Sequence, residues 1–184
     1  MPSKPKPPKR VKGKRRAMPR RKQLEQQLEA VVKLIVFWRD AQACVLADID
    51  GGRCRGDIQW GHFIPRKSSK YLKFDLATFS QCRGHNFLHD KNDPIFGIWF
   101  GKTFGLAAQE ALSVEQRAHT GANYDQTVDD LEAMLARYLE LFENRYYVEL
   151  DKASLIAAGY YGDIIAAHAE PQTLAEAERA TYGN

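Results

Sequence analysis

The chain has 184 residues, with 27 Lys and Arg, 23 Asp and Glu, and a formal net charge of +4. This length predicts one domain, and a hydrophobic content of 44% is enough for a real core. No apolar run approaches the ~18 residues that a membrane span needs, and the start lacks the apolar stretch of a secretory signal. Three cysteines, an odd number, argue against a disulfide framework. We therefore expect a cytoplasmic protein whose cysteines are thiols or metal ligands.

The charge is unevenly distributed. Residues 1–22 hold eleven of the basic residues, no acidic residue and five of the eight prolines, whereas the other 162 residues have a net charge of −7. A segment of this composition without apolar periodicity predicts a disordered basic arm that neutralises nucleic-acid phosphates. Arg15, Arg16, Arg20 and Arg21 are its candidate DNA contacts. The alternative is a tail that only aids solubility.

Helical periodicity is clearest in two stretches. From about Gln23 to Gln42, apolar residues recur at helical spacing: Leu24, Leu28, Val31, Val32, Ile35 and Trp38. Residues 125–144 carry a second such face: Val128, Leu131, Leu135, Tyr138, Leu141 and Phe142. Residues 105–118 predict a further helix. We expect one domain over residues 23–145 and a tail, 146–184, with one or two weak helices and no assigned function.

Residues 43–94 differ in composition from the predicted helices. They contain all three cysteines and three of the five histidines, and their strand-like pieces are short, at 58–60, 63–64 and 71–74. Residues 95–104 predict a strand or a short buried connection. The composition of segment 43–94 indicates too few apolar groups to stabilise its folded conformation by hydrophobic burial. We therefore expect a bound metal to supply that stability. Short strands between strong helices predict an α+β fold.

A zinc-binding pattern is present in this segment. Cys82 and His85 form a C-x2-H pair, a spacing that lets two ligands converge on one tetrahedral zinc ion. Cys44 and Cys54 are the candidates for the other half, although their C-x9-C spacing is long. Free cysteines can also be small buried hydrophobic residues. Because all three fall within 39 residues, we favour a structural zinc site.

His62 and Asn86 form a second candidate constellation. A histidine at a strand end can accept a proton from an attacking water, and an amide on a facing helix can hold a divalent cation on a scissile phosphate. Lys67, Lys70 and Lys73 follow His62 and suit phosphate contacts. By spacing alone, a structural histidine and a solvated lysine run are the commoner interpretations.

Four motifs together carry a family resemblance. Residues 61–66 (GHFIPR), 73–75 (KFD), 81–86 (QCRGHN) and 37–41 (FWRDA) resemble the NinG (Rap) family of lambdoid phages. Members of this family are recombination endonucleases of the HNH (His-Me finger) type that cut branched DNA such as Holliday junctions. The resemblance covers about residues 34–142.

The resemblance implies a fold and a set of roles. The fold would be a zinc-stapled ββα-metal unit flanked by amphipathic helices. His62 takes the general-base position and Asn86 the catalytic-metal position, while Cys82 and His85 take the second zinc pair. A catalytic Mg²⁺ or similar ion would rest on Asn86 together with His89 or Asp90. A rival assignment places His85 and His89, an i,i+4 pair, on the catalytic metal instead.

The sequence also departs from the family pattern. The first C-x2-C pair is absent, so Cys44 and Cys54 must serve with a different spacing. The middle Asn of the family, which holds the loop that orients the base, falls on Ala77, and the histidine after it falls on Phe79. Asp75 or Thr78 would have to substitute for that Asn.

These observations predict a metal-dependent, structure-specific endonuclease that resolves branched DNA in a phage-infected bacterial cell. The basic arm, Arg66 and the three lysines after it would grip backbone phosphates. Paired nicks in a symmetric junction imply a homodimer, with the amphipathic helices as its interface and no membrane partner. Two alternatives remain: a non-catalytic, zinc-dependent nucleic-acid-binding module, and an HNH nicking enzyme that acts on ordinary duplex.

Overall fold

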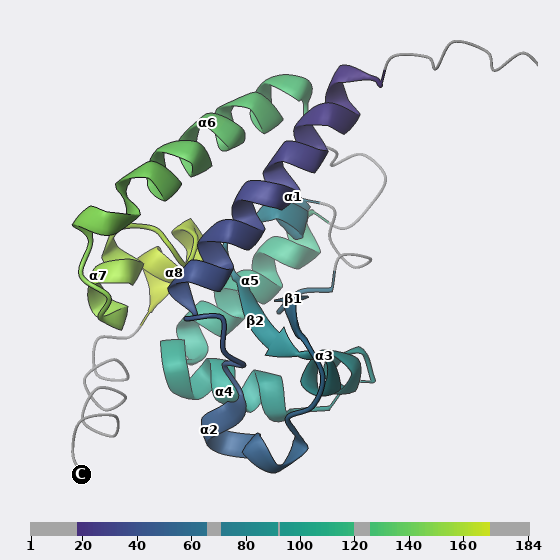
Figure 1. The fold of residues 1–184 in the computed structure, drawn as a ribbon, viewed down its shortest axis with the longest axis vertical. Coiled ribbons are helices and arrows are strands. Elements are labelled where there is room, and N and C mark those ends of the chain that lie inside the picture. Colours follow the sequence, from purple (N-terminus) through teal and green to yellow (C-terminus); the bar gives the residue numbers. More distant parts are fainter. Residues whose placement is uncertain (1–17, 66–70, 92, 120–125, 170–184) are drawn as a thin grey trace, which may run out of the picture.

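The computed structural model describes residues 18–65, 71–91, 93–119 and 126–169. They form an α+β fold, mostly helical, with one two-stranded antiparallel sheet (Figure 1). The elements are α1 (Arg20–Arg39), α2 (Ala47–Asp50), η1 (Gly51–Arg53), β1 (Ile58–His62), η2 (Tyr71–Phe74), β2 (Thr78–Cys82), α3 (Arg83–Asp90), α4 (Ile95–Phe104), α5 (Leu106–Ala118), α6 (Val128–Asn144), η3 (Arg145–Tyr147), α7 (Lys152–Ala157) and α8 (Asp163–His168). No helix in these ranges has the length and apolar character that crossing a membrane requires.

The long helices α1 and α6 lie side by side (Figure 1). The predicted face of α1 is buried as expected, from Leu24 to Ile35. On α6, Leu131 and Tyr138 are buried, whereas Val128, which was assigned to the same face, is exposed. α1 begins at Arg20, so the last three basic residues of the predicted arm are helical. The apolar faces of the two helices therefore pack against each other within one chain.

The sheet is small, and its two faces differ. In the β1–β2 register Trp60 lies opposite Ser80 and Gly61 opposite Phe79. Because side chains alternate along a strand, Trp60 and His62 share the face toward α1, where the Lys33 ammonium lies 5.5 Å from the centre of the Trp60 ring. Phe79 points to the other face, where the aromatic residues of α4 pack.

The aromatic core lies between the sheet and α4. Phe79 makes edge-on contacts with Phe96, Trp99 and Phe100, and Phe63 stacks on Phe100 with ring centroids 4.1 Å apart. Residues 95–104 are thus a helix, and the prediction of a strand or buried connection was wrong. Phe96, Phe100 and Phe104 recur at i, i+4 and i+8, which is helical spacing, and all three are fully buried.

Residues 43–94 contribute more to this core than their composition indicated. Phe74, Leu76 and Phe79 are almost completely buried, and Phe79 packs on aromatic residues of α4, outside this segment. That the segment has too few apolar groups to hold itself without a metal stays a prediction. The strand expected at 58–60 is present as β1. The one at 63–64 is a bend, and residues 71–74 form the 3₁₀ helix η2. β2, which was not predicted, supplies the second strand.

The segment after α6 packs on the same core. α8 lies against α5, and Leu155, Tyr160 and Ile165 are almost fully buried. The two short helices expected in this region are present as α7 and α8. Tyr160 also donates its hydroxyl hydrogen to the carbonyl oxygen of Leu141, at 2.7 Å, and so ties the segment to α6.

A buried ion pair joins three parts of the chain. The Arg39 guanidinium forms a two-pronged ion pair with Asp40 and donates to the carbonyl oxygens of Leu76, Thr78 and Tyr160 at 3.0, 2.6 and 2.8 Å. Burial disfavours its charged form, but Asp40, together with Tyr161 and Asp75, raises the pKa of Arg39 above its ordinary value. The end of α1, the start of β2 and the C-terminal segment are all held here.

A cavity of about 290 Å³ is lined by a half-buried carboxyl group, that of Asp75, together with Arg137 and Asp163. Asp75 accepts a hydrogen bond from the backbone N–H of Ala77 at 2.6 Å. Burial, with a smaller contribution from Asp163, raises the pKa of Asp75 to about 6. The folded chain therefore favours the protonated form of this carboxyl group more than the unfolded chain does.

Replacing Arg39 should destabilise the fold severely. In Arg39→Met the Asp40 charge stays buried without its partner and three carbonyl groups lose a donor, so we expect a loss of about 3–5 kcal/mol in the free energy of unfolding. Arg20→Met removes only the exposed ion pair with Glu132 and should cost less than about 1 kcal/mol. Denaturant titration measures both, and similar losses would refute the central role of Arg39.

Asp75→Asn should alter how stability depends on pH. The folded-state pKa lies above the ordinary value, so the stabilisation by Asp75 is complete below about pH 4 and is lost as the pH rises through 6. The variant should equal the wild type near pH 4 and be more stable by about 1–3 kcal/mol at pH 8. Denaturant titrations at both pH values test this. A difference that does not change with pH would contradict it.

Candidate metal centre

The four predicted zinc ligands converge at the junction of the sheet with α3. Cys44 follows α1 through a tight turn, in which Ala41 and Gln42 both adopt left-handed backbone conformations with φ of 52° and 54°. The backbone N–H of Val45 then donates to the carbonyl oxygen of Ser80 at 3.0 Å. This bond holds Cys44 beside β2.

Cys54 approaches α3 closely because position 84 is glycine. The backbone N–H of Gly84 donates to the carbonyl oxygen of Arg55 at 2.9 Å. A Cβ at Gly84 would lie 2.9 Å from the carbonyl oxygen of Arg53, closer than real Cβ atoms come. The absence of a side chain therefore lets the loop with Cys54 lie against the helix.

Cys82 and His85 lie at the start of α3. Cys82 is the N-cap residue, and its sulfur accepts from the backbone N–H groups of His85 and Arg55 at 3.5 and 3.4 Å. His85 lies one turn into the helix and is fully buried. The C-x2-H pair therefore spans the corner between β2 and α3.

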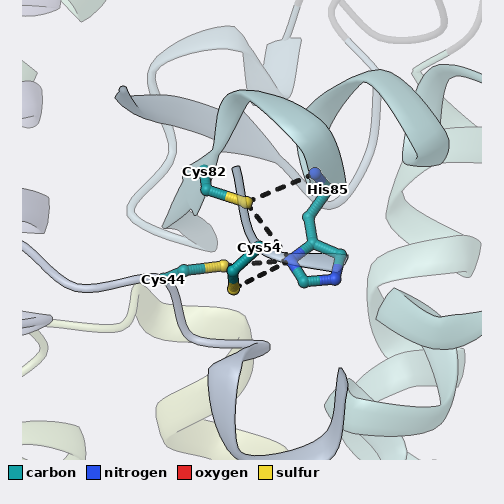
Figure 2. A group of neighbouring side chains, drawn as sticks. All are labelled: Cys44, Cys54, Cys82 and His85. Atoms are coloured by element: carbon teal, nitrogen blue, oxygen red, sulfur yellow. Dashed lines mark hydrogen bonds between the residues drawn. The ribbon is translucent and has the colours of Figure 1, made fainter. Parts of the chain in front are cut away.

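The ligand atoms fit a tetrahedral metal site. All four lie within 4.8 Å of one another, and Nδ1 of His85 is 3.3, 3.6 and 3.4 Å from the sulfurs of Cys44, Cys54 and Cys82 (Figure 2). With Zn–S and Zn–N bonds of about 2.3 and 2.0 Å, a tetrahedron has S···N edges of about 3.5 Å. These side chains can hold a metal ion such as zinc.

The three thiols differ in how readily they ionise. Burial raises the pKa of Cys44, and burial together with the neighbouring Cys44 raises the pKa of Cys54 to about 12. Burial acts on Cys82 too, but the N–H groups of His85 and Arg55 outweigh it and lower the pKa of Cys82 to about 7. A bound metal must therefore displace protons from Cys44 and Cys54.

The proposed general base, His62, lies at the end of β1 and is only 7% exposed. Its Nε2 lies 3.1 Å from the carbonyl oxygen of Lys73 in η2. A carbonyl oxygen can only accept, so Nε2 carries the proton and Nδ1 is the basic nitrogen of the neutral ring. The bond also fixes the plane of the imidazole.

The turn between η2 and β2, which follows the Lys73 carbonyl, is braced by local hydrogen bonds. Asp75 accepts from the N–H of Ala77, and the Thr78 hydroxyl donates to the carbonyl oxygen of Asp75 at 3.3 Å. Phe79 is buried in the aromatic core. Asp75 and Thr78, the two expected substitutes, therefore both brace the turn between η2 and β2.

Asn86 and His89 line the surface of α3 that faces β1. The Asn86 amide donates to Oε1 of Gln59 at 2.9 Å, and Nε2 of His89 lies 3.2 Å from the carbonyl oxygen of Phe63. The side chain of Asp90 lies outside the described part of the structure. His85 faces the three cysteines, so the structure groups it with them and not with His89.

Asn86 and His62 flank β1 from opposite faces. Gln59, the partner of Asn86, alternates with Trp60, whose face His62 shares. A cavity of about 430 Å³ lies at the free edge of β1 and is lined from both faces. Its lining residues are Lys33, Phe37, Ile58, Gln59, Trp60 and Asn86. Lys33 and Gln59 were not identified from the sequence, because neither belongs to a motif with a characteristic residue spacing.

A buried amide adjoins this group. Gln81 lies opposite Gln59 in the register and is fully buried, and among the described residues neither its nitrogen nor its oxygen has a hydrogen-bond partner. A Cβ at Gly61 would lie 2.5 Å from the Gln81 oxygen. Gly61 is thus required to admit the amide, because any side chain at this position would clash with it.

The predicted DNA contacts are only partly described. Arg15, Arg16, Arg66, Lys67 and Lys70 lie outside the described residues. Arg20 is paired with Glu132 at 2.6 Å, Arg21 donates to the carbonyl oxygen of Gln126, and Lys73 lies 3.6 Å from Glu25. These three cations already have intramolecular partners.

Comparison with known proteins adds no relative. No protein-family model matches this chain, and neither the curated proteins nor the solved structures contain a match. The resemblance to the NinG family therefore rests on the motif residues, and the function that it implies remains a prediction.

The two histidines of α3 should behave differently toward metal. His85→Ala removes the only nitrogen of the cluster and should abolish stoichiometric zinc binding, with a loss of several kcal/mol of stability. His89→Ala is the matched control and should keep about one zinc per chain. Elemental analysis of the purified variants, with thermal unfolding, measures this. Loss of zinc in both would favour the rival assignment to the catalytic metal.

Proposed function

We propose that the chain is a metal-dependent endonuclease of the HNH type that cleaves branched DNA in a phage-infected bacterial cell. The observation that carries this proposal is the order of elements at the site. An antiparallel strand pair leads directly into α3, with His62 at the end of the first strand, Asn86 on the helix, and Cys82 and His85 of the Cys–His cluster at the corner between β2 and α3. This is the order that the resemblance implies for a ββα-metal unit.

His62 would act as the general base. Its ring would accept the proton of the attacking water, while the contact of Nε2 with the Lys73 carbonyl holds the ring in orientation. The braced turn at Asp75 fixes the position of that carbonyl and hence of the ring. A general base positioned in this way contributes about 10²–10⁴-fold to a hydrolysis rate.

The free edge of β1 suits a phosphate and a divalent cation. A bound Mg²⁺ supplies charge stabilisation on the phosphate and the leaving oxygen. Asn86, which lines the cavity there, would hold it with an amide oxygen. Lys33, at the wall of the cavity, is paired with Glu29 at 2.6 Å and would exchange that carboxylate for a phosphate oxygen.

The Cys–His cluster would hold zinc in a structural role. Three sulfurs and one imidazole nitrogen fill all four positions of a tetrahedral ion, so none remains for substrate. Such a site supplies on the order of 10 kcal/mol of folding free energy. The centre would therefore fix α3 against β2 and leave the chemistry to the edge of β1.

DNA would be gripped mainly through phosphates. The basic residues of 1–17 and the cations of 66–73 supply sequence-independent contacts, so affinity should fall steeply with salt. A symmetric junction calls for two copies of the chain. Because α1 and α6 cover each other's apolar faces, the dimer would use other surfaces than the helix faces expected from the sequence.

A cleavage assay tests the proposal. We expect the wild type with Mg²⁺ to cut a labelled four-way junction and to spare the matching linear duplex, and EDTA to stop the cutting. His62→Ala should cut about 10²–10⁴-fold more slowly and bind the junction as before. His168→Ala, which replaces an exposed histidine on α8, is the control and should cut normally.

Other outcomes select the alternatives. Equal cutting of junction and duplex would indicate an HNH nicking enzyme that acts on ordinary duplex. Binding of both DNAs with no cleavage under any divalent ion would indicate a non-catalytic, zinc-dependent binding module. One observation favours this last candidate: His62 is almost buried and lies on the face of β1 opposite to Asn86.

A further inference from the structure

The imidazole of His85 has a partner at each end. Nδ1 faces the three sulfurs, while Nε2 lies 3.2 Å from Oδ2 of Asp50. The His85 side chain is fully buried, and that of Asp50 is 19% exposed. A carboxylate at this distance accepts a hydrogen bond from Nε2, so the lone pair of the neutral ring is on Nδ1, the nitrogen that points at the sulfurs.

Asp50 is itself held in place. It is the last residue of α2, and the same Oδ2 atom accepts from Nε of Arg53. Arg53 also donates to Oδ2 of Asp93 at 2.8 Å, and Oδ1 of Asp93 accepts from the backbone N–H of Ile95, the first residue of α4, at 2.9 Å. A continuous chain of hydrogen bonds thus runs from His85 to the start of α4.

We propose that Asp50 is the positioning residue of the metal centre. Its carboxylate fixes the tautomer and orientation of His85, as outer carboxylates do for metal-bound histidines. Arg53 and Asp93 keep the carboxylate in place. The inference rests on the metal centre of the proposed function and is independent of DNA cleavage.

The neighbouring acidic residue supplies a matched control. Asp48 lies in the same short helix and is exposed. Asp50→Asn keeps the size of the side chain and an oxygen that can accept from Arg53, but it removes the charge beside His85. Asp48→Asn makes the same chemical change two residues away.

Zinc affinity is measured on the purified full-length variants by competition with a chromophoric chelator. We expect Asp50→Asn to bind Zn²⁺ roughly 10–100-fold more weakly than the wild type, with about one ion per chain still bound at saturation. Asp48→Asn should match the wild type. Asp50→Glu, which keeps the carboxylate, should recover part of the affinity and serves as the test variant if Asp50→Asn does not fold.

Two further readouts separate positioning from general stability. The visible absorption of the Co²⁺-loaded Asp50→Asn protein should still show three sulfur ligands but change in detail, because the imidazole is no longer held. The metal-free form of the variant should unfold at nearly the same denaturant concentration as the metal-free wild type. Unchanged Zn²⁺ affinity and an unchanged Co²⁺ spectrum would overturn the proposal, even if the protein proved to be a nuclease.

Discussion

The arrangement of this molecule depends on one buried guanidinium group. Arg39 ends α1, and its donors reach carbonyl groups from the start of β2 and from the C-terminal segment, between the rings of Phe79 and Tyr161. Asp40 completes the group by accepting from the N–H of Ser80 at 2.7 Å. A buried charge is tolerated only where it is paired and fully hydrogen-bonded, so these backbone segments cannot separate without exposing an uncompensated ion.

The same group sets the position of the metal centre. Cys44 follows Asp40 by only four residues, and the two left-handed residues between them turn the chain back toward β2. Cys82 lies at the far end of the strand whose first residue is bound by Arg39. Two of the four ligands are therefore placed by backbone that Arg39 and Asp40 hold, before any metal contributes.

The elements that could be predicted are those with a regular residue pattern. α1, α5 and α6 were predicted from apolar residues on one helical face. The convergence of Cys44, Cys54, Cys82 and His85 was predicted because all three cysteines lie in one short segment. β2 and α4 were missed for different physical reasons. β2 is buried at every position, so it shows no alternation of polar and apolar residues, whereas α4 carries the apolar residue Ile98 on its exposed face, which hides the helical period of its buried phenylalanines. Asp50 and Arg39 could not be identified either, because most of their partners are distant in sequence or are backbone atoms.

Neighbouring residues at the β2–α3 corner serve two different faces of the sheet. Cys82 and His85 turn toward the sulfur cluster, whereas Asn86 turns toward Gln59 in β1 and the Gln81 amide lies over Gly61. A metal ion held at the corner would therefore fix the position of α3 relative to β1, on which the position of the Asn86 amide depends. Through Asp50, Arg53 and Asp93 the cluster also reaches the first turn of α4, which supports the aromatic core beneath the sheet. Such a centre would act through geometry: it would hold the polar groups beside β1 in place, while its four ligands would leave no position open for chemistry.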